Sequence, residues 1–224
     1  MQRLRTGERR PEVRAGRRAV SARSFVLNDG LSHIRSFVLL LSLYSTQPLH
    51  AADENQQFAI KGIGLSNCKS FVEAREHQSP QYFQFGGWMN GYLSAANRYE
   101  QDTFDLVPWQ STGMLTASLA DFCERNPGLQ FVRAVALLLN TLGPDRLQVE
   151  SDLIDAKVGE TSVVIYRATL QRAQKKLVEQ QHLVGEPSGE FDDATRQALL
   201  GFQEASGLEP TGLPDQATLL QLFK

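Results

Sequence analysis

The chain has 224 residues, enough for one medium-sized or two small domains, and a formal net charge of −2. The charge is unevenly distributed. Residues 1–51 hold nine Arg, no Lys and three acids (+6), whereas residues 52–224 hold fourteen Lys or Arg and twenty-two acids (−8). Phosphate contacts need a basic face, so residues 52–224 are not expected to bind nucleic acid.

The N-terminal region has the pattern of an export signal. Arg35 precedes an apolar run of about ten residues, 36–45, which is too short to span a bilayer stably. Small residues follow at Ala51 and Ala52, and we expect cleavage after Ala51, with no stable membrane span afterwards. The Arg-rich stretch before Arg35 contributes nothing to such a signal. Two interpretations stay open for it: an arm that binds nucleic acid or anionic lipid, and a start site assigned too far upstream.

Both cysteines, Cys68 and Cys123, follow the expected cleavage site. An even pair in an exported protein usually forms a disulfide, because the compartment is oxidising. Closing this loop of 55 residues stabilises the fold by at most about 4 kcal/mol in the chain-entropy model. Two buried free thiols are the alternative if the chain is not exported.

Apolar residues recur at helical spacing from Leu65 to Leu142, which predicts about four helices in a domain spanning residues 52–145. Asn126-Pro127 is a typical helix start, because Asn caps the first turn and Pro needs no N–H partner there. Residues 146–162 are polar, acidic and weakly periodic, and we interpret them as a linker, with a short helical piece as an option.

The helical period returns at Val163, and a phrase then occurs twice: GEFDDATRQAL at 189–199 and GLPDQATLLQL at 212–222. In each copy an Asp (Asp192 and Asp215) precedes a helical stretch, where its carboxylate accepts hydrogen bonds from the free N–H groups of the first turn. A glycine three positions earlier permits a tight turn. Residues 163–224 are therefore predicted to form a small three-helix domain.

These residues resemble the peptidoglycan-binding-like domain family, a three-helix module attached to many wall hydrolases. The positions that match the family pattern are Leu170, Gln171, Leu177, Gly189, Phe191, Thr195, Phe202, Gln203, Leu208, Gly212, Thr218 and Leu222. The resemblance implies peptidoglycan as the partner, although such units also serve as packing or protein-binding modules. Candidate binding residues are Gln171, Arg196 and Gln203, and the Arg196 guanidinium suits a stem-peptide carboxylate in two-pronged geometry.

The region before the linker carries a second, weaker resemblance. CKSF at 68–71, WMNGYLSAAN at 88–97 and DFCERNPGLQFVRAVALLL at 121–139 are similar to small periplasmic proteins of the HdeA-like kind and to secretion-system immunity proteins. The first family implies acid-stress chaperoning, and the second implies inhibition of a toxin. We expect this domain to contact a periplasmic protein.

No catalytic motif stands out. After the leader only His77 and His182 remain, in different domains, and no metal-ligand spacing, nucleophile motif or phosphate loop is present. No cofactor, metal site or catalytic residue is therefore predicted. The sequence favours an all-α, two-domain, non-catalytic periplasmic protein that binds peptidoglycan. The alternatives are a wall hydrolase whose acids come from distant positions, which zymography detects, and an acid-stress chaperone, which suppresses client aggregation at low pH.

The export prediction has a direct check. If the signal is cleaved after Ala51, the mature protein begins at Ala52, and intact-mass spectrometry of the protein from its native host reports that mass. A mature form that begins at Met1 would overturn the prediction.

Overall fold

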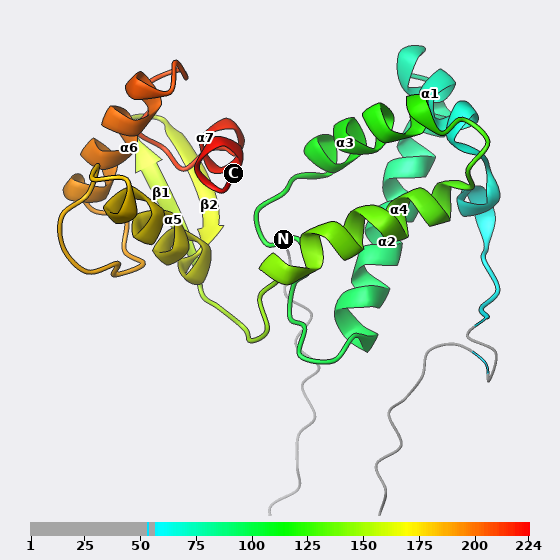
Figure 1. The fold of residues 1–224 in the computed structure, drawn as a ribbon, viewed down its shortest axis with the longest axis horizontal. Coiled ribbons are helices and arrows are strands. Elements are labelled where there is room, and N and C mark those ends of the chain that lie inside the picture. Colours follow the sequence, from blue (N-terminus) through cyan, green and yellow to red (C-terminus); the bar gives the residue numbers. More distant parts are fainter. Residues whose placement is uncertain (1–52, 54–56) are drawn as a thin grey trace, which may run out of the picture. The chain divides into compact units, whose positions relative to one another are not determined.

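The computed structural model describes Asp53 and residues 57–224 (Figure 1). The expected export signal and the Arg-rich leader, residues 1–51, lie outside the described residues. None of the helices in the described part of the chain is both long and apolar enough to cross a membrane.

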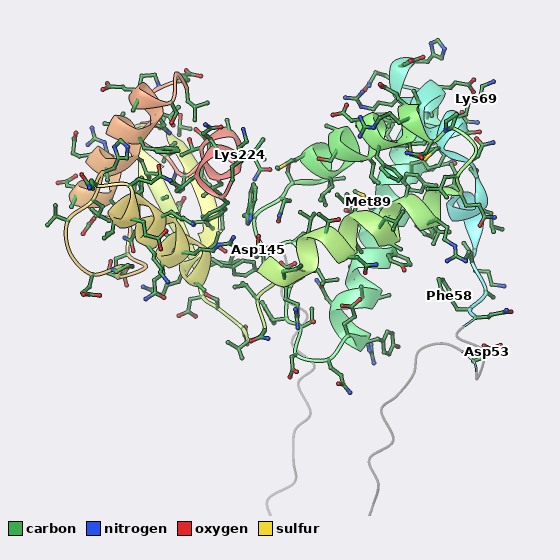
Figure 2. All side chains as sticks on the ribbon, in the orientation of Figure 1. Asp53, Phe58, Lys69, Met89, Asp145 and Lys224 are labelled. Atoms are coloured by element: carbon green, nitrogen blue, oxygen red, sulfur yellow. A yellow bond between two sulfur atoms is a disulfide. The ribbon has the colours of Figure 1, made fainter. Side chains whose placement is uncertain are left out.

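Residues 62–145 contain the four predicted helices, preceded and followed by short 3₁₀ turns. The helices are α1 (Cys68–Glu76), α2 (Pro80–Tyr99), α3 (Thr112–Arg125) and α4 (Phe131–Leu142), and the turns are η1 (Gly62–Leu65) and η2 (Gly143–Asp145). Three aromatic rings from three helices meet in the core. Phe71 lies 5.3 Å from Phe85 and 4.9 Å from Phe131, between ring centroids. Met89, labelled in Figure 2, is buried in the same core.

The predicted disulfide is confirmed. Cys68, the first residue of α1, is bonded to Cys123 in the last turns of α3, and both are fully buried. No cysteine is left free in the described chain, which includes every cysteine of the sequence. The bond joins two helices that pack on one another, so it adds a covalent link to a small hydrophobic core.

The predicted helix start at Asn126-Pro127 is wrong. Asn126 ends α3, where its side-chain amide donates to the Phe122 carbonyl, and α4 begins only at Phe131. The intervening loop is used instead to complete the start of α1: the Cys68 N–H donates to the Leu129 carbonyl at 2.8 Å, and the Lys69 N–H donates to the Pro127 carbonyl at 3.0 Å. The loop carbonyls thus satisfy helix-terminal N–H groups that would otherwise lack partners, and this long-range pairing outweighs the local preference for a helix.

The C-terminal part of the structure, residues 153–224 and called the C-terminal half below, begins with a β-hairpin. The all-α expectation therefore needs correction. Strands β1 (Leu153–Val158) and β2 (Thr161–Tyr166) pair antiparallel, with Ile154 opposite Ile165. The hairpin occupies most of the stretch that was interpreted as a linker, and the expected helical period at Val163 is in fact strand. β-Branched residues fill β2 and Gly159 adopts φ +59° in the turn, which are both hairpin features.

Three helices follow: α5 (Arg167–Glu179), α6 (Asp193–Ala205) and α7 (Gln216–Leu222). Ile165 of the hairpin belongs to the same core as these helices, and Figure 1 shows β1 and β2 beside them. The buried leucines of this core are Leu170, Leu177, Leu199, Leu219 and Leu222. Both predicted N-caps are confirmed: Asp192 accepts from the Thr195 N–H at 2.8 Å, and Asp215 accepts from the Thr218 N–H at 2.9 Å.

Removing the disulfide should destabilise residues 62–145, called the helical half below, without changing their fold. Replacing Cys68 and Cys123 together by Ser is expected to lower the free energy of unfolding by about 4 kcal/mol at most, because the unfolded chain regains its loop entropy. Urea unfolding followed by circular dichroism measures the loss. Wild-type protein unfolded with a reductant is the control and should match the double variant. Equal midpoints for the oxidised wild type and the variant would contradict the expectation.

Candidate functional site

The repeated phrase forms two turns of the same construction, each closed by a buried glutamine. In the first, the Gln174 side-chain carbonyl accepts from the Gly189 N–H at 2.7 Å. Its amide donates to the Glu190 carbonyl at 2.9 Å and to the Thr195 hydroxyl at 2.8 Å. One side chain therefore fastens α5 to the turn and to the first turn of α6.

Gln203 repeats this arrangement on α6. Its carbonyl accepts from the Gly212 N–H at 2.8 Å, and its amide donates to the Leu213 carbonyl at 3.0 Å and to the Thr218 hydroxyl at 2.8 Å. Gln203 is 0 % exposed. The expectation that Gln203 lies on the surface is therefore wrong, because both ends of its amide are used inside the fold.

Two arginines lie across the two turns. Gly189 and Gly212 have φ of +75° and +67°. A Cβ on Gly189 would lie 2.8 Å from Arg167 Cγ, and a Cβ on Gly212 would lie 3.1 Å from Arg196 Cγ. Arg196 follows Arg167 by 29 positions, just as Gln203 follows Gln174. The two arginines are thus equivalent positions of the internal repeat, and glycine is needed beneath each.

The equivalent arginines have different partners. Arg167 forms an ion pair with Glu190 and a longer one, 3.9 Å, with Asp152. The position that corresponds to Glu190 in the second copy is Leu213, which is buried and carries no charge. Arg196 has only a 4.0 Å ion pair with Asp193 among the described residues, and its Nε is buried without a hydrogen-bond partner. The donors that remain for a ligand are therefore those of its two terminal nitrogens.

Arg196 lies in a cleft of about 450 Å³. One wall comes from the end of β1 and the hairpin turn, residues 157–159, and the other comes from residues 191–193 and Arg196. Phe191 is half-buried and supplies an apolar surface, and the charged side chains are Lys157, Asp192, Asp193 and Arg196. The cleft therefore combines two cations, two acids and one aromatic ring.

Asp192 serves the fold as well as the cleft. Hydrogen bonds from the Thr195 side chain and then from the Thr195 N–H hold the pKa of the Asp192 carboxyl below its ordinary value. The same carboxylate caps α6. Asp193, by contrast, is fully exposed, and its only ion pair in the described chain is the long contact to Arg196.

Of the three predicted binding residues, only Arg196 lines this cleft, and its role in binding stays a prediction. Gln171 is exposed on α5, where its amide donates to the Pro187 carbonyl at 2.9 Å and so ties down the loop before Gly189. Sequence reasoning missed Lys157, because it falls in the supposed linker. It matched Phe191 to the family pattern without assigning it to a surface.

A second cleft, of about 360 Å³, lies in the helical half and is lined by Ser70, Glu73 and His77 of α1 among others. These residue types occur in hydrolytic sites, but no hydrogen bond between their side chains is present in the described structure; only the His77 N–H donates, at 3.2 Å, to the Glu73 main-chain carbonyl. Ser70 donates to Asn67 at 3.0 Å, and Glu73 pairs with Lys69 at 3.7 Å. Within residues 57–224, no group of three or more His, Cys, Asp or Glu side chains is placed to hold a metal ion.

Residues 167–222 match the model of a family described as "putative peptidoglycan binding domain". The match covers 56 of the 224 residues, from the first residue of α5 to the last of α7. The C-terminal part of the chain is therefore a peptidoglycan-binding-like domain, as the sequence predicted. No curated protein and no solved structure matches the chain. The resemblance of the helical half to HdeA-like proteins finds no support among these comparisons.

The buried glutamines predict a large effect of an almost isosteric change. Gln203→Leu leaves the Gly212 N–H and the Leu213 carbonyl buried without a partner, and is expected to lower the free energy of unfolding by about 3 kcal/mol. Gln197→Leu, on the exposed face of the same helix, is the control and should change it by less than about 0.5 kcal/mol. Urea unfolding of the two variants makes the comparison. Equal stability would show that the glutamine does not hold the turn.

Proposed function

We propose that this protein is an exported, non-catalytic protein that binds peptidoglycan through its C-terminal domain, while its helical half contacts another protein in the periplasm. The family match over residues 167–222 supports the wall as partner. The match and the Cys68–Cys123 disulfide are both consistent with a protein outside the cytoplasm.

The observation that carries the proposal is the guanidinium of Arg196 in its cleft, whose only ion pair in the described chain is the 4.0 Å contact to Asp193. The stem peptides of peptidoglycan end in carboxylates, and an arginine binds a carboxylate through two parallel hydrogen bonds. The Arg196–Asp193 pair is long and partly exposed, and a pair of this kind contributes little stability. A ligand carboxylate therefore replaces it at small cost.

The proposed role of the helical half rests on its exposed aromatic residues. Its core is complete, yet α2 leaves Phe83 68 % exposed and Tyr99 55 % exposed. Exposed aromatic side chains are common at protein interfaces. The cleft around Arg196 is built entirely from residues of the C-terminal half, so both exposed rings of α2 remain available for a protein partner.

Sedimentation with insoluble peptidoglycan sacculi tests the proposal. The chain from Ala52 to Lys224 is expected to pellet with sacculi, and Arg196→Gln is expected to weaken binding about tenfold, because it removes a charge-assisted pair of hydrogen bonds. Lys175→Gln removes an exposed cation of α5 outside the cleft and is the matched control. Phe83→Ser should also bind as the wild type does, since it alters only the helical half.

Two results would contradict the proposal. Failure of the wild-type chain to pellet would remove the wall-binding function and leave the C-terminal domain as a protein-binding module. A cleared band in a wall-impregnated gel, lost on mutation of acids in the chain, would replace the non-catalytic interpretation with a wall hydrolase.

A further inference from the structure

The cleft around Arg196 extends beyond the segment that matches the family. The match begins at Arg167, but residues 157–159 belong to the preceding hairpin. The hairpin is a fixed part of this half, because Ala156 is fully buried and Ile165 packs in the core with α5 and α6. In this chain the hairpin therefore forms one rigid side of the cleft, which carries Lys157, beside the helices of the binding domain.

The cleft carries charges of both signs, and most of them have no close partner among the described residues. Lys157 is exposed and no ion pair to it occurs within the described chain, and Arg196 has only the long contact to Asp193. Asp193 is likewise available, whereas one Asp192 oxygen is occupied by the Thr195 N–H. A matching ligand carries carboxylates for the cations and an ammonium group for Asp193, with an apolar stem between them that packs on Phe191.

We propose that this cleft binds the stem peptide of peptidoglycan, and specifically an un-cross-linked stem that presents a free side-chain ammonium beside a carboxylate. The inference rests on the proposed wall binding and deepens it. Cross-linking turns the side-chain amine into an amide and removes its charge. Lys157 and Arg196 bind the carboxylates, and Asp193 binds the ammonium group.

A glycan strand fits the cleft less well. Sugar rings present neutral hydroxyl groups and apolar faces, and they are bound by exposed aromatic rings and uncharged polar groups. Here the only aromatic ring is the half-buried Phe191, and four of the lining side chains are charged. Covering these charges with a neutral ligand costs solvation that the ligand cannot replace. A zwitterionic peptide replaces it with ion pairs.

The experiment is a titration of the isotope-labelled chain 52–224, followed by NMR, with two soluble ligands. The first is a tripeptide stem with a free side-chain amine on its third residue and a free C-terminal carboxylate, and the second is the same peptide acetylated on that amine. The free-amine peptide should shift the amide signals of residues 157–159 and 191–196 and bind roughly fivefold more tightly than the acetylated one.

Two variants test which ligand group each of Asp193 and Lys157 binds. Asp193→Asn should remove the preference for the free amine and leave the affinity for the acetylated peptide unchanged. Lys157→Gln should weaken binding of both peptides by a similar factor, roughly three- to fivefold. Asp155→Asn, an exposed acid on β1 outside the cleft, is the control for the first change, and Lys175→Gln is the control for the second.

The outcomes separate this inference from the wall binding on which it rests. If the chain pellets with sacculi but soluble glycan oligomers compete and neither peptide shifts the cleft signals, the peptide site is wrong and wall binding stands. If both peptides bind equally, recognition of the free amine is wrong. If the chain does not pellet but the free-amine peptide shifts the cleft signals, the peptide site stands without the wall.

Discussion

The C-terminal half depends on one interaction that occurs twice: a buried glutamine amide that closes a glycine turn. Gln174 and Gln203 each accept from the glycine N–H and donate to the next carbonyl and to the hydroxyl of a threonine in the first turn of the following helix. A turn of this kind would otherwise bury main-chain groups without partners, at a cost of about 1–3 kcal/mol each. Because the amide satisfies them, the chain folds back twice within sixty residues and three short helices share one core.

The same construction explains why a cation is available for binding. The glycine beneath each arginine lets the side chain lie flat over the turn. In the first copy, Glu190 neutralises Arg167 and makes it a structural residue. In the second copy, Leu213 takes that position and turns inward to the core, so Arg196 faces the cleft with its charge uncompensated except by Asp193. One substitution between two copies therefore separates a structural arginine from a candidate binding arginine.

Apart from the disulfide, sequence reasoning predicted the features that depend on neighbouring residues and missed those that depend on distant ones. The caps at Asp192 and Asp215 act over three residues, and both were predicted correctly. The disulfide was predicted from cysteine number and expected compartment. The start at Asn126-Pro127 failed, because the loop carbonyls pair with α1 far away in the sequence. Strand β1 has one fully buried residue, Ala156, so its alternating pattern was too weak to predict a hairpin or the position of Lys157. Gln203 looked like a surface amide, because nothing local shows that an amide is buried.

The two copies of the repeat overlap, and the overlap has a consequence for how this half unfolds. Helix α6 receives the first glutamine at Thr195, near its beginning, and carries the second, Gln203, near its end. Neither copy is complete without it. Unfolding of the whole of α6 therefore releases both turns at once, so this half should exchange its protected amide hydrogens as a single cooperative unit rather than helix by helix. The cleft at the start of α6 is thereby held by the global stability of the domain, and not by the local stability of a surface loop.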